Sequence, residues 1–196
     1  MSKIIVIDTE TTGFDPRWDE VLQVGITDEN GNILFNEYFK PEHKTEWKEA
    51  ELVNGISPAF VQNKPLLIDR LDVIQRIFRE ANTIVGYNTN FDLRFLANTG
   101  LMIRPDAQIV DVMLSFAPIG GVLKDHTSRG RTYKGFKCQK LTVAAAHYNY
   151  DWAEYGKHDA IGDAKATAFV FSKIRDERPD LLSPEEWVRP DGEERE

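Results

Sequence analysis

Residues 3–14 read KIIVIDTETTGF, and this stretch decides the fold that the sequence predicts. Its first part, 3–7, is a short apolar run rich in β-branched side chains, which is typical of a strand buried at the centre of a sheet. Asp8 and Glu10 follow directly, and side chains two residues apart on a strand point to the same side. The stretch therefore predicts a central strand that ends in two adjacent carboxylates.

The segments after this stretch predict a mixed sheet. A second strand-like run at 21–27 leads through Asn30-Gly31 to a return run at 32–39, and Asn-Gly between two such runs is a strong hairpin signal. Strands and helices then alternate, which indicates an α/β fold: a mixed five-stranded sheet, three antiparallel strands then parallel strands, flanked by helices. Further strands are expected at 83–87 and 108–111, helices at 69–81, 90–98, 111–117, 140–149 and 160–176, a helix start at Ser57-Pro58, and a long loop at 118–138.

The composition indicates one globular domain. The 196 residues are 41% hydrophobic and 29% charged, which suits a single domain with a full core. No stretch of 18 apolar residues occurs, so we expect no membrane-spanning helix. The first apolar run stops at Asp8 and is too short for a signal peptide, so we expect a cytoplasmic protein. Cys138 is the only cysteine, which excludes an intramolecular disulfide and a thiolate metal site.

The net charge of −8 is unevenly distributed. Residues 176–196 hold nine acids and three arginines, a net of −6, which leaves −2 for residues 1–175. We therefore divide the chain into a domain at 1–176 and an acidic C-terminal tail at 177–196, with a short helix expected from the capping pattern SPEE at 183–186. Two bound divalent cations would bring the body to about +2, so the charge does not exclude nucleic acid.

Asp8 and Glu10 predict a metal site. Two adjacent anions at the edge of a core are costly unless they are protonated or neutralised by a cation. Hard oxygen ligands on one face suit Mg²⁺ or Mn²⁺. The small residues Thr11, Thr12 and Gly13 leave backbone amides open to a phosphate or a sugar. A solvated strand end is the alternative interpretation.

A second class of enzyme begins in a similar way. Haloacid-dehalogenase-type phosphatases place D-x-D-x-T after their first strand. Here Glu10 stands at the second acidic position, and no convincing lysine motif for that class follows. The sequence therefore disfavours a phosphatase of this type.

Two further acidic residues follow later strands. Asp92 comes after the strand at 83–87, where by itself it is most simply a first-turn helix carboxylate stabilised by the helix dipole. Asp163 lies in the first turns of the last helix, and His158 precedes it. A histidine at a loop edge can take a proton from an attacking water near neutral pH, although a lone one is more often an ordinary surface residue. Four carboxylates can hold two divalent cations, the arrangement that cleaves phosphodiesters in two-metal nucleases.

Three motifs in this order make the chain resemble the DEDD exonucleases of the histidine subtype (DEDDh), within the ribonuclease-H-like fold. That family includes the proofreading (epsilon) subunit of bacterial DNA polymerase III and stand-alone relatives. The resemblance covers residues 3–175. The motifs are VIDTETTGF at 6–14, VGYNTNFDLRFL at 85–96 and HDAIGDA at 158–164, with VNGIS at 53–57, DVML at 111–114 and KLTVAAAHY at 140–148 as further landmarks.

The resemblance implies a 3′→5′ exonuclease that hydrolyses phosphodiester bonds and releases nucleoside 5′-monophosphates, using two divalent cations, Mg²⁺ or Mn²⁺. It implies that Asp8 bridges both cations. Glu10 and Asp163 would complete the first metal site, and Asp92 would serve the second. His158 would be the general base.

The resemblance also implies contacts to the terminal nucleotide. The backbone near Thr11 and Thr12 would hold the 3′-OH, while Phe14 and Phe91 would contact the base or the sugar. Two departures concern substrate preference rather than the reaction: Asn54 stands where relatives often have histidine before Gly-Ile, and Tyr87 stands where many have histidine before asparagine. The substrate contacts expected in these motifs are Thr11, Thr12, Gly13, Phe14, Asn54, Asn88 and Phe91.

The segment at 124–140, KDHTSRGRTYKGFKCQK, carries six basic residues against one acid. Its cations can neutralise several phosphates, and Tyr133 and Phe136 are available for stacking on bases. A flexible, solvated loop is the alternative. The basic residues are Lys124, Arg129, Arg131, Lys134, Lys137 and Lys140, of which Arg129, Arg131 and Lys134 are the predicted substrate contacts.

The polymer stays open at this point. We favour DNA with a single-stranded or frayed 3′ end, and an RNA-directed 3′→5′ exoribonuclease is the main alternative. A non-catalytic module that binds nucleic acid or a polymerase is the alternative from another class, and the complete set of acids with His158 argues against it. A DNA polymerase or another replication protein is compatible as a partner, but no docking motif identifies one.

Overall fold

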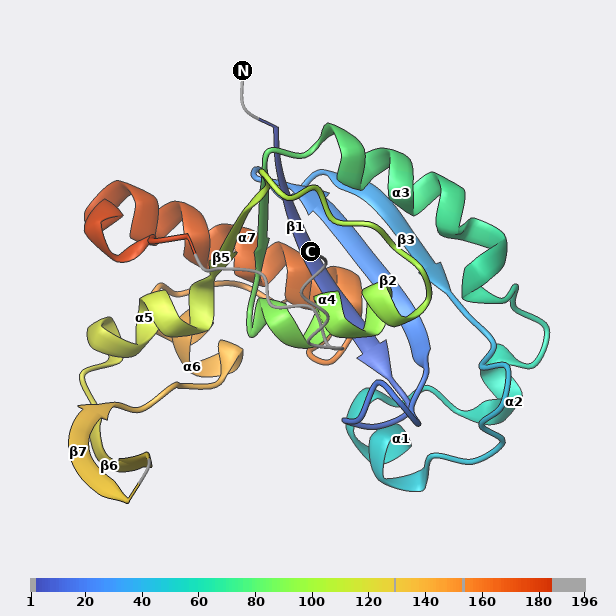
Figure 1. The fold of residues 1–196 in the computed structure, drawn as a ribbon, viewed down its shortest axis with the longest axis horizontal. Helices are drawn as coiled ribbons and strands as arrows, with labels where there is room; N and C mark the ends of the chain where they lie inside the picture. Colours follow the sequence, from blue (N-terminus) through green and yellow to red (C-terminus); the bar gives the residue numbers. More distant parts are fainter. Residues whose placement is uncertain (1–2, 129, 153, 185–196) are drawn as a thin grey trace, which may run out of the picture.

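Five strands form the central sheet of the molecule (Figure 1): β1 (Ile4–Thr11), β2 (Val21–Asp28), β3 (Ile33–Tyr38), β4 (Thr83–Gly86) and β5 (Gln108–Asp111). Their order is β3-β2-β1-β4-β5. β1 and β2 pair antiparallel, as do β2 and β3, whereas β4 runs parallel to both β1 and β5. The predicted α/β class with a mixed sheet is confirmed. The computed structural model describes residues 3–128, 130–152 and 154–184.

Helices cover both faces of this sheet (Figure 1). They are α1 (Lys48–Asn54), α2 (Pro58–Val61), α3 (Leu71–Glu80), α4 (Thr89–Asn98), α5 (Val112–Gly120), α6 (Leu141–His147) and α7 (Ala160–Glu177), with the short 3-10 helices η1 (Leu67–Arg70) and η2 (Pro179–Leu181). Among the described residues, none of the helices combines the length and the apolar character that crossing a bilayer requires.

β1 is the central strand because both of its faces are apolar. Ile5 and Ile7 pack into one core cluster with side chains of α3 and α4, and Val6 packs into a second cluster with side chains of α5, α6 and α7. All three side chains are fully buried. Alternation along the strand then places Asp8 and Glu10 on the same side as Val6, which is the side that α7 covers.

α7 lies very close to the sheet at its first turn. A Cβ atom added to Gly25 of β2 would lie only 2.5 Å from the carbonyl carbon and oxygen of Ala160. Ala164 and Ala168 continue the buried face of the helix, and small side chains at this spacing let a helix approach a sheet closely. Because the helix begins at this contact, Gly25 helps to position Asp163 in the first turn.

The hairpin β6 (Leu123–Ser128) and β7 (Arg131–Phe136) corrects the expectation of a long loop at 118–138. The sequence-based prediction was wrong because both faces of this hairpin are mostly polar, so no alternation of apolar and polar residues marks the strands. The turn includes Gly130, whose φ of +74° is readily adopted by glycine. The basic segment is therefore strand structure over most of its length.

One other difference concerns the helices. α1 was not expected, because none of its residues is buried and it has no apolar period. α2 begins at the predicted Ser57-Pro58 start, where Ser57 Oγ accepts a hydrogen bond from the Phe60 amide at 3.1 Å. The division of the chain after residue 176 stays a prediction, and residues 185–196, with most of the expected tail helix, lie outside the described residues.

We expect Gly25→Ala to lower the free energy of unfolding by about 2 kcal/mol or more, because the new methyl group would overlap the backbone of α7. Chemical denaturation measures this change. Gly156→Ala is the matched control, because a Cβ atom there would meet nothing within 4 Å, and we expect it to keep wild-type stability. Equal stability of the two variants would contradict the proposed close contact between β2 and α7.

Candidate active site

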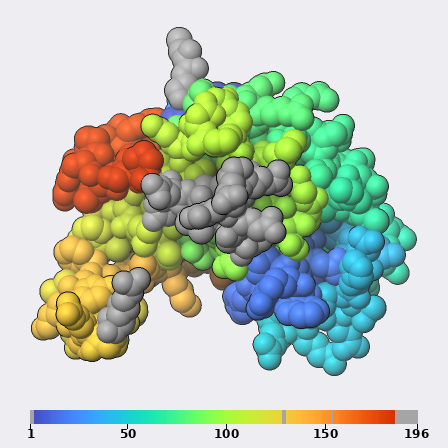
Figure 2. Space-filling model, in the orientation of Figure 1, coloured from blue at the N-terminus to red at the C-terminus, as the bar shows by residue number. Residues whose placement is uncertain are grey.

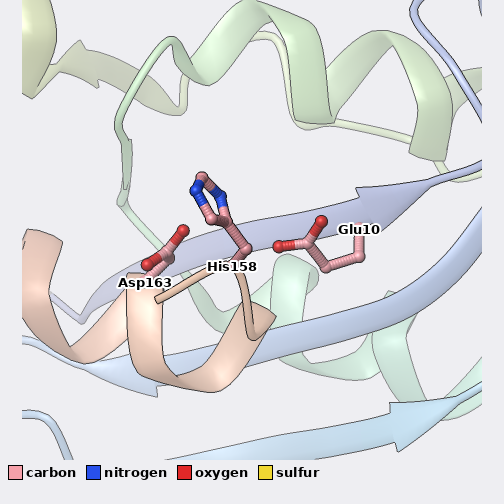
Figure 3. Close-up of side chains that lie close together, drawn as sticks. All are labelled: Glu10, His158 and Asp163. Atoms are coloured by element: carbon pink, nitrogen blue, oxygen red, sulfur yellow. The ribbon is translucent and has the colours of Figure 1, made fainter. Parts of the chain in front are cut away.

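The acidic residues singled out in the sequence come from three elements. Asp8 and Glu10 lie on β1, Asp92 lies in the first turn of α4, and Asp163 lies in the first turn of α7. Glu10, His158 and Asp163 each offer a ligand atom, and these atoms lie within 4.8 Å of one another. Figure 3 shows these three side chains gathered over the end of β1. A single cation can bridge groups at this spacing.

Asp92 is held against β1 by Thr9. Its Oδ1 accepts hydrogen bonds from the Thr9 amide at 2.9 Å and from the Thr9 hydroxyl at 2.7 Å. Thr9 lies between Asp8 and Glu10 on the strand and points to the opposite face. Thr9 therefore fixes the carboxylate of a residue that lies 83 positions later in the chain. This contact was not expected from the sequence.

Burial and mutual repulsion raise the pKa values of this acidic group. The pKa of Asp8 lies well above its ordinary value because of burial, then because of the charges of Asp92, Asp163 and Glu10. Burial, followed by the charge of Asp163, raises the pKa of Glu10 to about 8. Burial also raises the pKa of Asp92 and of Asp163 to about 7. A cation bound among these acids would favour their anionic forms and lower their pKa values.

A partly buried network of hydrogen bonds connects the start of α7 to the sheet. Asp159 caps the helix by accepting hydrogen bonds from the amides of Ile161 at 3.1 Å and Gly162 at 3.2 Å. The other oxygen of Asp159 accepts hydrogen bonds from the Tyr38 hydroxyl at 2.8 Å and from the Gln23 amide nitrogen at 3.3 Å. Gln23 in turn accepts a bond from the Ala160 amide at 3.0 Å. These bonds fix the helix turn that carries Asp163.

Sequence analysis did not identify this network. The position of Asp159 before a helix was a readable signal, because aspartate is a favoured N-cap residue. Gln23 and Tyr38 gave no signal, since they lie in predicted strands more than 120 residues before the helix.

His158 is exposed and lies in the left-handed region of the backbone, with φ of 59°. Its neighbour Asp159 is the N-cap, so the histidine comes immediately before the helix. A positive φ is uncommon for residues other than glycine, although histidine adopts it more often than most. The backbone here supports a histidine that faces the acidic group, as Figure 3 shows.

Asn88 also has a left-handed backbone, with φ of 71°, and forms the turn between β4 and α4. Its amide donates a hydrogen bond to Asp111 Oδ1 at 2.9 Å. Asp111 also caps α5 by accepting a bond from the Met113 amide at 2.9 Å. These contacts give Asn88 a role in the backbone turn that precedes Asp92; its predicted contact with substrate stays a prediction.

A groove of about 670 Å³ adjoins the acidic group. It is bordered on one side by β1 and the turn after it, and on the other side by α1. Asn54 connects the two sides, because its side-chain nitrogen donates to the Thr11 carbonyl oxygen at 3.2 Å. The groove brings together six of the predicted substrate contacts: Thr11, Thr12, Gly13, Phe14, Asn54 and Phe91.

Two aromatic rings stand at this groove. Phe14 is 87% exposed, and its ring centroid lies 6.4 Å from that of Phe91. Phe91 packs in turn on Phe95, which is buried in the core. An exposed phenylalanine beside polar groups is available for contact with a ligand.

The predicted basic contacts lie elsewhere. Arg131 and Lys134 belong to β7, outside the residues that line the groove, and alternation along the strand places them on opposite faces of the hairpin. Arg129 lies outside the described residues.

Comparison with known proteins assigns the family. A family model described as Exonuclease, of the RNase T type, matches residues 5–171. The chain belongs to this exonuclease family. The assignment confirms the resemblance to DEDD exonucleases and the prediction of a nuclease, which is a hydrolase.

Individual relatives agree with the family. The chain is 31% identical to the DNA polymerase III subunit epsilon of Rickettsia conorii over 176 residues, which make up 87% of this chain and 72% of the relative. It is 36% identical over 95 residues to the PolC-type DNA polymerase III of Thermotoga maritima, covering 47% of this chain and 7% of that protein. A solved structure of E. coli exonuclease I with a dA16 oligonucleotide has a TM-score of 0.69 at 21% identity, covering 92% of this chain and 42% of that one.

The chain therefore spans a small part of the PolC-type polymerase and less than half of exonuclease I. What is common to these proteins is the exonuclease family and the ribonuclease-H-like fold.

The raised pKa values predict how stability depends on pH. Without divalent cations, Glu10, Asp92 and Asp163 keep their protons to a higher pH in the folded protein than in the unfolded chain. In the unfolded chain these carboxyl groups have ordinary pKa values of about 4. The stabilisation from these protons is complete below about pH 4 and is lost as pH rises to about 8. We expect the Tm of the metal-free protein to fall between pH 5.5 and 8, and the increase in Tm caused by Mn²⁺ to grow over the same range.

Thermal unfolding in EDTA and in MnCl₂ at several pH values measures both effects. Asp163→Asn provides the comparison, because it removes one of the repelling acids and should make the metal-free Tm less dependent on pH. A metal-free Tm that rises from pH 5.5 to 8 would contradict the electrostatic account.

Proposed function

We propose that the protein is a 3′→5′ exonuclease that hydrolyses the terminal phosphodiester bond of DNA and releases nucleoside 5′-monophosphates. The observation that carries the proposal is the convergence of Glu10, Asp163 and His158 at the end of β1, beside a groove that can admit the end of a strand. Membership of the exonuclease family supports the same chemistry.

The donors suit two divalent cations, Mg²⁺ or Mn²⁺. Asp8, Glu10, Asp92 and Asp163 offer only carboxylate oxygens, which are the ligands that these ions prefer. Burial is the main cause of the raised pKa of Asp8, followed by the charges of Asp92 and Asp163, so Asp8 lies near both of these acids. When bound, the cations would polarise the phosphate and stabilise the charge that develops on its oxygens.

His158 is the proposed general base. Its ring nitrogen lies close enough to the ligand oxygens of Glu10 and Asp163 to reach a water molecule positioned among them. Exposure lets the ring pass the proton on to solvent after each cleavage. Asp159, by capping the adjacent helix turn, keeps the histidine and Asp163 at the same end of α7.

The groove beside β1 is the proposed site of the terminal nucleotide. Backbone groups near Thr11 and Thr12 would hold the 3′-OH, and the exposed Phe14 ring, with Phe91 next to it, would contact the base or sugar. Asn54 would align the two walls through its bond to the Thr11 carbonyl. Cleavage one nucleotide at a time follows if the chain end must lie in the groove.

DNA is favoured as the polymer. The relative from Rickettsia conorii is named as a subunit of a DNA polymerase, and the E. coli exonuclease I structure contains a DNA oligonucleotide. By analogy, a DNA polymerase is the proposed kind of partner, and action in the cytoplasm stays a prediction. RNA as the substrate, and a non-catalytic binding module, are the alternatives that the experiment below distinguishes.

The direct test uses a 5′-labelled oligonucleotide of about 20 nucleotides, as DNA and as RNA, with Mg²⁺, Mn²⁺ or EDTA. We expect a ladder of products that shortens from the 3′ end of DNA only when the metal is present. Asp8→Ala removes the shared ligand and should lower the rate by about 10⁴-fold, a scale seen when a central member of a catalytic group is lost.

The matched control for that variant is Asp106→Ala, because Asp106 is an exposed aspartate that pairs with Arg104 on a surface turn. Trimming of RNA alone would identify an exoribonuclease. Binding of the oligonucleotide with no trimming in any metal would identify a non-catalytic module, and full activity of Asp8→Ala would disprove the proposed site.

A second test concerns the base. If His158 accepts the proton, His158→Gln should lower kcat by about 10²–10⁴-fold while the Mn²⁺ concentration for half-maximal rate stays the same. A metal-ligand role would instead shift that concentration to higher values. His43→Gln is the control, because His43 is an exposed histidine paired with Glu20 rather than with the acidic group.

A further inference from the structure

The hairpin of β6 and β7 has two chemically different faces. Cross-strand partners lie on the same face of a sheet, and successive residues alternate between faces. The register pairs His126 with Tyr133 and Asp125 with Lys134. These two pairs are adjacent along the strands, so they lie on opposite faces.

Among the described residues of the two strands, one face carries positive charge and no acid. On it lie Lys124, opposite Gly135, the pair His126 and Tyr133, and Arg131 at the turn end. We call these four side chains the cationic face: Lys124, His126, Arg131 and Tyr133. The other face carries Asp125 opposite Lys134, and Leu123 opposite Phe136, so its lysine has a carboxylate directly across from it.

The cationic face also presents a flat aromatic surface. The rings of His126 and Tyr133 are stacked, with centroids 5.4 Å apart and planes inclined by 13°. Gly135 makes room for this arrangement, because a Cβ atom there would lie 3.0 Å from the His126 ring. Tyr133 remains 55% exposed, so its ring is available to a further partner.

The hairpin projects from one corner of the molecule, as Figure 2 shows for residues 123–128 and 130–136. In Figure 1 it lies at the end of the sheet where β1 ends, on the side away from α1. The groove for the terminal nucleotide lies between β1 and α1. The groove and the hairpin therefore both lie at the end of the sheet where β1 ends.

We propose that the cationic face binds the single-stranded part of the substrate several nucleotides before its 3′ end, with an unpaired base stacked on Tyr133 and phosphates paired with Lys124 and Arg131. This inference rests on the proposed exonuclease function. Charge complementarity favours a polyanion, because the face holds cations and no carboxylate. The stacked rings favour a single strand, because a duplex keeps its bases stacked on one another.

Two matched pairs of variants on β7 test this assignment. In the first pair, Arg131→Ala and Lys134→Ala each remove one positive charge. In the second pair, Tyr133→Ala and Phe136→Ala each remove one aromatic ring. In each pair only the first residue lies on the cationic face. Binding is measured by the anisotropy of fluorescein-labelled dT20 in EDTA, so that no cleavage occurs, at several salt concentrations.

We expect Arg131→Ala to reduce the slope of log affinity against log salt by about 0.7, the value for one phosphate contact on a single strand. Lys134→Ala should retain more of the wild-type slope. Tyr133→Ala should weaken binding by about tenfold at constant slope, and Phe136→Ala should weaken it less. Equal effects within either pair, or a dT20·dA20 duplex that competes as well as dT20, would overturn the inference.

A second readout separates this inference from the proposed function. The 4-nitrophenyl ester of thymidine 5′-monophosphate contains a single nucleotide, so it lacks the upstream strand that the hairpin is proposed to bind. Arg131→Ala and Tyr133→Ala should lower the ratio of kcat/KM for the labelled oligonucleotide to kcat/KM for the ester by about tenfold or more. If wild-type protein cleaves neither substrate, the proposed function fails, while the anisotropy still tests the hairpin. If dT20 does not bind and polyglutamate does, the face binds an acidic protein and the inference is wrong.

Discussion

Carboxylates brought together at the end of β1 repel one another, and hydrogen bonds and close packing from neighbouring strands and helices hold them in place. Burial already raises the pKa of each acid, and the neighbouring charges raise those of Asp8 and Glu10 further. A chain free to relax would separate such groups, so their proximity requires rigid support. β1 provides part of it: the buried Ile5, Val6 and Ile7 anchor the strand that carries Asp8 and Glu10. Bound cations can therefore offset this repulsion in the folded protein.

The remaining support comes from contacts between distant parts of the chain. Thr9 holds Asp92 with two hydrogen bonds, and Gln23, Tyr38 and Asp159 hold the first turn of α7. Gly25 allows that turn to approach the sheet. Each of these residues helps to position the carboxylate of another residue, either Asp92 or Asp163. The precision of the acidic group therefore depends on packing between β1, β2, α4 and α7 rather than on any one motif.

This division explains what could be predicted from the sequence. The central strand, the two acids after it and the order of the later motifs follow from local patterns, namely an apolar run, alternation and short spacings. Thr9, Gln23 and Tyr38 could not be identified, because their partners lie far away in the chain and their residue types are ordinary in strands. α1 and the hairpin of β6 and β7 were not predicted for another reason. Neither buries an apolar face, and it is burial that gives the sequence of a helix or strand a periodic pattern of apolar residues.

The hairpin shows why a charge count over a segment is a weak guide to binding. The basic run at 124–140 reads as one patch, yet the strand register divides its residues between two faces and sets Asp125 opposite Lys134. A polyanion that follows one face meets the cations of that face together with its stacked rings, whereas on the other it meets a lysine already facing a carboxylate. The geometry of the backbone, rather than the number of lysines and arginines, thus determines which cations can act together on one strand of nucleic acid.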